Sequence, residues 1–262
     1  MKEMLILFAA GLCALGNVSA RAVSAGESGK ADLMIASHGR SDARIIVSPS
    51  CGPWEKKAAE DLAYYFKRIS GADIPVINER QAIDKALETR VPLFIIGQEA
   101  IKVRGGLRDT LNAVLKQKPY VRTDGIILKR QGNCVYLAGN NGPSHYYAVA
   151  ELLHRLGCRW YMPTEFGECI PVKRELKVGD LDYAYSSPFE IRSYWISWNG
   201  DNSGAAEFQA RNMMTGRAAM PPTGHALARY TNGLGKGAFN FPITAPETAR
   251  HVAKQVEKTY AD

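Results

Sequence analysis

The stretch VYLAGNNGPSHYYAVAELLHRLGCRWYMP, residues 135–163, decides the fold of this chain. Its first four residues, 135–138, form an apolar run that predicts a strand, and the run stops at a glycine- and asparagine-rich loop, 139–142. Beyond the loop, apolar residues recur every three or four positions, which places them on one face of a helix. Gly157 stands where a left-handed C-cap would end that helix. We therefore predict a strand, a tight loop, a helix and a second short strand over 158–161.

The loop at 139–142 invites comparison with a phosphate-binding loop. It lacks the Gly-Lys-Ser/Thr ending of a P-loop and the GxGxxG spacing of dinucleotide-binding proteins, so a tight strand-to-helix turn is the favoured interpretation. His145 and His154 lie in the predicted helix with Glu151 but do not form the HExxH pattern, which disfavours metalloprotease chemistry. We expect surface or helix-cap positions for both histidines.

The chain before this stretch alternates between strand and helix patterns. The predicted elements are strands at 33–36, 44–47, 74–77, 91–96, 125–130 and 134–138, helices at 54–70 and about 108–116, and a weak helical period at 78–89. Gly71 suits the C-cap of the first helix, and Pro75 suits a strand at a sheet edge. The alternation is irregular, so we predict an α/β (α+β) fold, a mixed sheet with packed helices.

The composition changes beyond a brief strand predicted at 175–178. Residues 183–198 are rich in tyrosine and tryptophan, and the chain to 236 is rich in Gly, Asn, Met and Pro. A last helix is expected to follow, its apolar face made by residues between 249 and 260. We predict a domain over 26–182 and a second domain that begins at 183 and extends to 262.

The first 25 residues have the pattern of a signal peptide. An apolar run at 5–15 precedes two small-x-small sites, which place cleavage after Ala20 or Ala25, and the run is too short for a stable membrane span. We expect an exported protein, periplasmic or extracellular. Four cysteines remain after cleavage, and they could pair in three ways in an oxidising compartment. Their spacing fits no zinc motif, so no metal site is predicted.

The net charge of +7 is dispersed along the chain. No Lys/Arg-rich run and no nucleic-acid-binding motif accompanies it, so nucleic-acid binding is disfavoured and a solvated surface is the default explanation. The 46% of hydrophobic residues in a chain of 262 suffices for a sizeable core.

Four segments resemble, in the same order, the N-terminal domain and first barrel strand of alpha-glucuronidase-like glycoside hydrolases. They are AAEDLAYYFKRISGADIPV (58–76), LFIIGQ (93–98), the segment 124–163 that contains the opening stretch, and SPFEIRSYW (187–195). The first domain is also similar in plan to the N-terminal domain of beta-N-acetylhexosaminidases. The resemblance extends over about 33–262, and it lies in the ordered series rather than in any one segment.

The resemblance implies a small, usually non-catalytic α/β domain followed by a (β/α)8 barrel that acts on glycosidic bonds of a poly- or oligosaccharide, with no cofactor. If 190–195 is the first barrel strand, Arg192, Trp195, Trp198 and Asn199 lie at or just beyond its catalytic end. In the related families an arginine of this strand holds sugar hydroxyls, and Arg192 is the residue that matches. Guanidinium donors suit adjacent hydroxyls or a uronate carboxylate, and indole faces suit sugar rings. Asn212 and His225 are weaker candidates for sugar contacts.

The segment 183–262 is far shorter than the roughly 250 residues of such a barrel. The resemblance therefore implies an incomplete barrel segment whose pair of catalytic carboxylates lies beyond Asp262, because Asp201, Glu207 and Glu247 belong to no motif. A non-catalytic carbohydrate-binding or scaffold module is the alternative. Packing at a domain junction is the alternative role of Arg192: a sugar contact predicts that Arg192→Ala lowers activity with little change in melting temperature, whereas packing predicts the loss of both.

Overall fold

The computed structural model describes residues 22–24, 31–194, 204–215, 230–231, 234, 242 and 244–260. The chain divides into two compact units, Met1–Gly216 and Arg217–Asp262. The expected signal peptide lies outside the described residues except for a three-residue strand, β1 (Ala22–Ser24). Among the described helices, none has the length and apolar character needed to cross a membrane.

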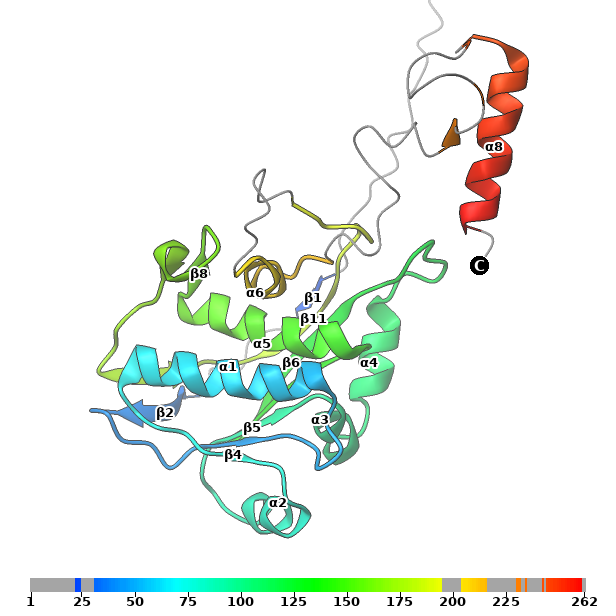
Figure 1. Ribbon diagram of the computed structural model, residues 1–262. Coiled ribbons are helices and arrows are strands. Elements are labelled where there is room, and N and C mark those ends of the chain that lie inside the picture. The colour runs from blue at the N-terminus through cyan, green and yellow to red at the C-terminus, as the bar shows by residue number, and fades with distance from the viewer. Residues whose placement is uncertain are drawn as a thin grey trace, which may run out of the picture. The chain divides into compact units, whose positions relative to one another are not determined.

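One mixed sheet of seven strands organises the first unit (Figure 1). Its spatial order is β1, β11 (Asp182–Ser186), β6 (Gly125–Gln131), β7 (Cys134–Gly139), β5 (Leu93–Ile96), β3 (Arg44–Ile46) and β4 (Val76–Ile77). The strands β7, β5, β3 and β4 are parallel to one another, whereas β6 pairs antiparallel with both β7 and β11. The predicted mixed sheet is confirmed, and β4, which follows Pro75, lies at its edge as expected.

Helices cover both faces of this sheet. Their bounds are α1 (Pro53–Ser70), α2 (Arg80–Leu87), α3 (Gln98–Val103), α4 (Leu107–Val114), α5 (Gly142–Leu156) and α6 (Ala205–Arg211). Strand β5 shows why both faces are apolar: Phe94 and Ile96 belong to the core under α1 and α5, while Leu93 and Ile95 belong to the core under α2, α3 and α4. A strand buried on both sides is a continuous apolar run, as LFII is.

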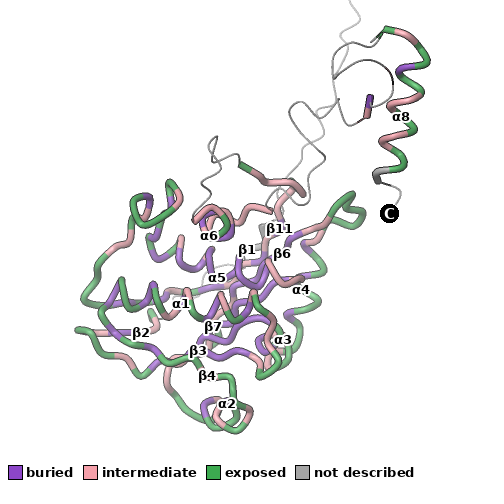
Figure 2. Tube along the Cα trace, in the orientation of Figure 1, coloured by how far each residue is buried: buried purple, intermediate pink, exposed green. Residues whose placement is uncertain are grey.

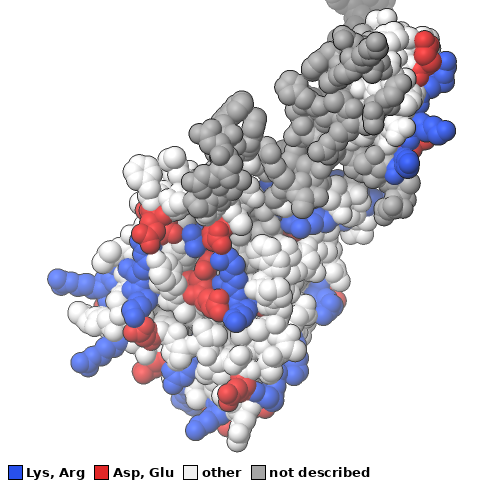
Figure 3. All heavy atoms as spheres, in the orientation of Figure 1, with Lys and Arg blue, Asp and Glu red and all other residues white. Residues whose placement is uncertain are grey.

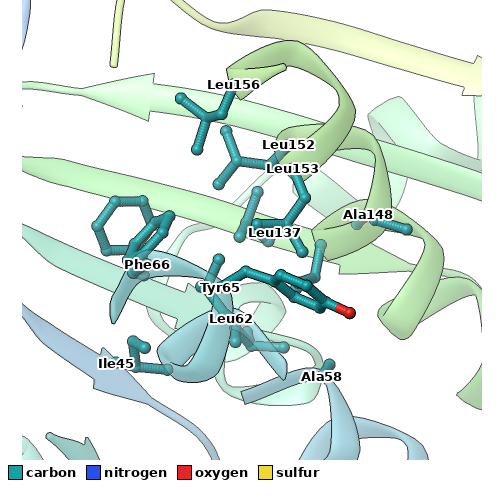
Figure 4. Packing of buried hydrophobic residues seen from close by; sticks show 14 of the residues in the cluster. Ile45, Ala58, Leu62, Tyr65, Phe66, Leu137, Ala148, Leu152, Leu153 and Leu156 are labelled. Atoms are coloured by element: carbon teal, nitrogen blue, oxygen red, sulfur yellow. The ribbon is translucent and has the colours of Figure 1, made fainter. Parts of the chain in front are cut away.

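Helices α1 and α5 lie side by side over the sheet (Figures 1 and 4). From α1, Leu62 and Phe66 are fully buried, and they meet Leu153 and Leu156 of α5 above Leu137 of β7. Burying one such side chain contributes about 1.5–3 kcal/mol. The purple trace in Figure 2 follows these elements and the sheet between the layers. The periodicity of the opening stretch predicted this packing face.

The ends of these helices follow the local signals. The carboxylate of Glu55 accepts a hydrogen bond from the backbone N–H of Gly52 at the start of α1, and Gly71 adopts a left-handed conformation (φ 75°) at its end. In α5 the side chain of Asn141 accepts from the N–H of Ser144, and Gly157 (φ 107°) ends the helix. These caps confirm the predicted helix ends.

Two small sheets and a short 3-10 helix complete the first unit. They are β2 (Leu33–Ser37) with β10 (Glu175–Val178), β8 (Arg159–Trp160) with β9 (Glu168–Cys169), and η1 (Glu165–Gly167). The strand predicted at 158–161 is thus β8, which pairs outside the main sheet. Helix α3 has no counterpart among the predicted elements, because its six residues are too few to show a helical period.

The chain beyond 182 contributes to the same sheet. The expected domain border at 182/183 falls inside β11, whose residues all pair with β6, and the first compact unit extends to Gly216. Of the expected barrel strand at 190–195, the structure describes residues up to Tyr194, and these form no strand. The described part of the second unit is mainly α8 (Pro246–Tyr260), where a helix was predicted. The assignment of domains stays a prediction.

Candidate functional site

Arg192 lies in the segment that follows β11, and its backbone is fixed by Thr215. The N–H of Arg192 donates to Thr215 Oγ1 (2.8 Å), and the N–H of Thr215 donates to the Arg192 carbonyl (2.8 Å). Thr215 closes the short segment after α6. The pair therefore joins two segments about twenty residues apart in sequence and brings the end of α6 beside Arg192.

The side chain of Arg192 is engaged in three hydrogen bonds. Nη2 donates to Asp124 Oδ2 (2.7 Å), Nε to the carbonyl of Met213 (2.8 Å) and Nη1 to the carbonyl of Phe189 (2.7 Å). A guanidinium has five N–H groups, so one on each Nη has no bond among the described residues. The side chain is 20% exposed. Arg192 thus anchors this junction, while two of its N–H groups have no hydrogen bond among the described residues.

Asp124, which sequence reasoning did not single out, is the centre of this arrangement. It directly precedes β6, and its carboxylate is 1% exposed. Besides Arg192, the carboxylate receives the guanidinium of Arg122 (3.1 Å), the amide of Asn141 (3.0 Å) and the hydroxyl of Ser144 (3.4 Å). A buried carboxylate is tolerated when it is paired in this way, and removal of one partner is costly. We therefore expect Arg192→Ala to lower stability whether or not Arg192 binds a sugar, so melting temperature alone does not separate the two roles.

Asn212 lies directly after α6. Its side-chain amide donates to the carbonyls of Trp160 (3.1 Å) and Phe208 (2.9 Å). The structure brings Asn212 and Arg192 together on the wall of one cavity of about 140 Å³. The other lining residues are Asp124, Ile126, Tyr147, Tyr185, Ser187 and Met213. Two of the predicted site residues therefore do meet.

Tyr147 of α5 gives this cavity an aromatic wall. The guanidinium carbon of Arg192 lies 5.9 Å from the centre of the Tyr147 ring, and the Tyr147 hydroxyl donates to the carbonyl of Met214 (2.6 Å). Burial raises the pKa of Tyr147, and the nearby Asp124 charge adds to the effect. The hydroxyl is consequently a neutral donor at physiological pH. An aromatic face beside guanidinium donors is a chemistry that suits sugars.

The remaining candidates either lie outside the described residues or line other parts of the structure. Trp195, Trp198, Asn199 and His225 lie outside the described residues, as does Asp201. Glu207 of α6 is 43% exposed and lies 3.9 Å from Lys57, and Glu247 belongs to the second unit. Asp124 is the carboxylate that lines the cavity, and it is held in ion pairs. The described residues therefore show no pair of carboxylates at this place that could cleave a glycosidic bond.

A second polar cluster holds α6 against the rest of the first unit. Arg211 donates to Glu168 (3.1 Å) and Asp61 (3.5 Å), and the hydroxyls of Tyr65 and Tyr146 donate to the same two carboxylates. Burial raises the pKa values of both tyrosines, so they stay protonated donors. Asp61 and Tyr65 are one helical turn apart, which the sequence reveals. Nothing local in the sequence indicates that Arg211 reaches them.

His145 corrects one expectation, because it is 2% exposed and not at the surface. Its Nδ1 accepts from the N–H of Gly139 (3.0 Å), and Nε2 faces the side-chain amide of Gln98 (3.1 Å). Burial lowers the pKa of His145, against the opposing charge of Glu55. His154 is half-buried beside Trp160 and hydrogen-bonds the carbonyl of Arg211 (3.0 Å). Both histidines are structural groups within α5.

The described residues contain no group of three or more His, Cys, Asp or Glu side chains that could hold a metal ion. Cys51, Cys134, Cys158 and Cys169 are free thiols in this part of the chain, and burial raises the pKa of Cys158 to about 11. A thiol with so high a pKa is not a nucleophile at neutral pH. Pairing of the cysteines in an oxidising compartment stays a prediction.

Comparison with known proteins gives a likeness of fold. No family model matches the chain, and no curated protein sequence matches it. Among solved structures, the chain is similar to a family GH115 4-O-methyl-alpha-glucuronidase, BtGH115A, with specificity for decorated arabinogalactans. The two are 14% identical with a TM-score of 0.50, and the match covers 87% of this chain and 35% of the glucuronidase.

A second match is the structure of CpGH84D, which is 13% identical. It covers 87% of this chain and 40% of that protein, with a TM-score of 0.38, too low to indicate a shared fold. The chain thus spans about a third of the length of the glucuronidase that it resembles. The likeness to that glucuronidase shows that this chain has a glycoside hydrolase-like fold.

Proposed function

We propose that this chain is the N-terminal part of an exported glycoside hydrolase, and that the cavity beside Arg192 forms one wall of a sugar subsite. The observation that supports the proposal is the meeting of Arg192 and Asn212 on one cavity with the ring of Tyr147. The two N–H groups of Arg192 that have no hydrogen bond among the described residues suit a pair of neighbouring hydroxyls or a carboxylate on a sugar ring.

The volume of the cavity fits this partial role. Complete small-molecule sites have roughly 300–1,000 Å³, whereas this cavity has about 140 Å³. In the proposal, Trp195, Trp198 and Asn199 extend the subsite, since they follow Arg192 by three, six and seven positions. His225 is a further candidate contact.

Hydrolysis needs two carboxylates across the scissile bond. In our proposal they come from later barrel strands, beyond the part of the fold that this chain supplies. A non-catalytic carbohydrate-binding or scaffold module is the second candidate function. It is favoured by one observation, the engagement of the cavity's carboxylate, Asp124, with both Arg122 and Arg192.

The test compares Arg192→Ala with Arg122→Ala. Each change removes one guanidinium from the buried Asp124, so we expect similar losses of stability, about 2 kcal/mol. Of the two arginines, only Arg192 lines the cavity that holds Asn212. We therefore expect sugar binding by calorimetry to weaken at least tenfold in Arg192→Ala and to stay within about twofold of the original in Arg122→Ala, measured well below both melting temperatures.

The ligand panel consists of uronic-acid and hexosamine glycosides, together with a decorated arabinogalactan because the similar glucuronidase is specific for such polymers. Equal effects of the two substitutions on binding would assign Arg192 to packing alone. Hydrolysis of any member of the panel separates the enzyme from the binding module. Binding without hydrolysis by the complete protein would favour the second candidate.

Export is part of the proposal and has its own measurement. Cleavage after Ala20 would leave β1 in the mature protein, where it pairs with β11, whereas cleavage after Ala25 would remove it. Sequencing the N-terminus of protein recovered from the periplasm or medium distinguishes the two sites. Recovery of uncleaved chain from the cytosol alone would contradict export.

A further inference from the structure

A second cavity lies where two neighbouring parallel strands end. It has about 550 Å³ and shares no lining residue with the cavity at Arg192. Its walls come from the loop after β3, from α3, and from single residues of α2 and α4. A volume of this size accommodates a ligand as large as a sugar or a small phosphorylated metabolite.

The topology of the sheet explains why a cavity forms at this edge. After β3 the chain enters α1, which covers one face of the sheet, and after the adjacent β5 it enters α3, which covers the other face. The two connections diverge and leave a crevice beyond the carboxyl ends of the strands. In open α/β sheets such a switch point is where ligands bind.

The charge of the cavity is positive. Arg80 and Glu99 neutralise each other through two hydrogen bonds of 2.8 Å, and the Glu99 carboxylate is 1% exposed. Lys102 and Arg108 are both exposed, and neither has a carboxylate within 4.0 Å among the residues that the structure describes. On the face that Figure 3 shows, Lys and Arg side chains are interspersed with Asp and Glu side chains. Two cations of the cavity are left for a ligand.

The uncharged side chains that line this cavity add hydrogen-bond donors. The hydroxyls of Ser48 and Ser50 lie 3.2 Å apart, and one hydrogen bond between them leaves one hydroxyl proton to donate. Since Nδ1 of His145 accepts from a backbone N–H, the proton of the neutral ring is on Nε2. The structure places Nε2 of Gln98 3.1 Å from Nε2 of His145. Two N–H groups cannot share one hydrogen bond, so the carboxamide oxygen belongs at that position and the NH2 group at the other end of the amide. Gln98 lines the cavity, and we count its NH2 group among the donors of the proposed site.

We propose that this crevice binds a small organic oxyanion, a carboxylate or a phosphate ester on a molecule of about the size of one sugar ring. Lys102 and Arg108 contact the anionic group, and the serine hydroxyls and the Gln98 amide donate to it or to neighbouring hydroxyls. The cavity offers donors and positive charge, while its carboxylate, Glu99, is occupied by Arg80. The inference is independent of the proposed hydrolase function.

The test is calorimetric titration of the whole chain with glucuronate, glucose 6-phosphate, inorganic phosphate and glucose. The first two share a ring and differ in the anionic group, so they distinguish a carboxylate from a phosphate ligand. We expect at least one of them to bind at least tenfold more tightly than glucose, and binding to weaken at higher salt. Binding of phosphate alone would restrict the ligand to a free inorganic ion and overturn the proposal for an organic one.

Lys102→Ala/Arg108→Ala should weaken binding at least tenfold. The matched control is Lys118→Ala/Arg90→Ala, which removes the same two charges from exposed positions outside the cavity. It should leave binding within about twofold. Equal weakening in both double variants, or no weakening in either, would overturn the proposal, as would equal affinity for glucose and the two anionic sugars.

A single substitution tests the proposed site even if the Lys102→Ala/Arg108→Ala double variant fails to fold. Gln98→Glu retains an acceptor for the Nε2 proton of His145 and adds a negative charge to the cavity wall. We expect at least tenfold weaker binding of the anionic sugar, with a melting temperature close to that of the original chain. Unchanged anion binding in Gln98→Glu would contradict the placement of the ligand.

Discussion

At the scale of single residues, the contacts of Arg192 are compatible with both roles that the sequence leaves as alternatives. Three of its N–H groups hold Asp124, Met213 and Phe189, so the side chain packs a junction. The same guanidinium lines a cavity with two donors unused among the described residues. A residue held by its neighbours is also preorganised for a ligand. The comparison with Arg122 therefore tests a difference in binding and not the presence of packing.

His145 predicts a pH dependence of stability. Its pKa in the folded protein is lowered by burial below the ordinary value near 6.5, so between these two values the unfolded chain binds more protons. The contribution of His145 to the free energy of unfolding is fully present above about pH 6.5, and it decreases as the pH falls toward the pKa of the folded protein. The expected slope is at most about 1.4 kcal/mol per pH unit for one histidine.

Denaturant titrations between about pH 7.5 and 5.5 measure this slope. This pH range lies above the ordinary pKa values of carboxylates. His145→Asn should flatten it, since an asparagine oxygen can accept from the N–H of Gly139 without titrating. The slope should not vanish in His145→Asn, because burial also lowers the pKa of His154, which still contributes to it. The control is His38→Asn at an exposed position, where φ is 49°, a conformation that asparagine tolerates. An unchanged slope in His145→Asn would show that the ring is solvated.

At the scale of elements, Gly139 decides how closely β7 approaches α5. A Cβ added at Gly139 would lie 2.3 Å from the backbone carbon of Ser144, in the first turn of the helix. The helix backbone cannot move aside as a flexible side chain can. We expect Gly139→Ala to lower the free energy of unfolding by roughly 3 kcal/mol, the upper end of the range for an overpacked core.

The control for this prediction is Gly105→Ala, where an added Cβ meets no atom within 4 Å. Its effect should stay within about 0.5 kcal/mol. Chemical denaturation of both variants at one pH gives the comparison. A loss in Gly139→Ala no larger than in the control would mean that the loop at 139–142 can relax away from the helix backbone.

At the scale of the whole molecule, we expect the first unit to depend on α6, which belongs to it, and not on the second unit. Arg211 lies between two carboxylates, Asp61 and Glu168, that are 13% and 4% exposed. We expect a chain that ends at Gly216 to unfold cooperatively, with nearly the melting temperature that the first unit has in the chain of 262 residues. A chain that ends at Tyr194 lacks Arg211, which leaves Glu168 with Arg68 and Asp61 with Lys57 as their remaining charge partners.

The shorter chain should be less stable by roughly 3 kcal/mol, as expected when one partner of a buried ion pair is removed. Thermal melts of the two chains, followed by circular dichroism, measure the difference. Equal melting temperatures would show that the first unit ends before α6. That outcome would support the border predicted at 182/183 from composition.

The sequence by itself determined the local elements of this protein. Periodicity and turn chemistry predict helix α5 with its Gly157 cap, the β6–β7 hairpin and the edge position of β4. These signals are local, since each depends on residues within a few positions of one another.

Only the tertiary structure decided which polar groups meet. Arg192 and Asp124 are 68 positions apart, and their ion pair depends on the register of β11 against β6 and on the docking of α6. The crevice between β3 and β5 likewise depends on strand order, because strands adjacent in space are separated by α1, β4 and α2 in the chain. Sequence patterns carry no direct record of such long-range neighbours, so the partners of Arg192, the burial of His145 and the second cavity required the fold.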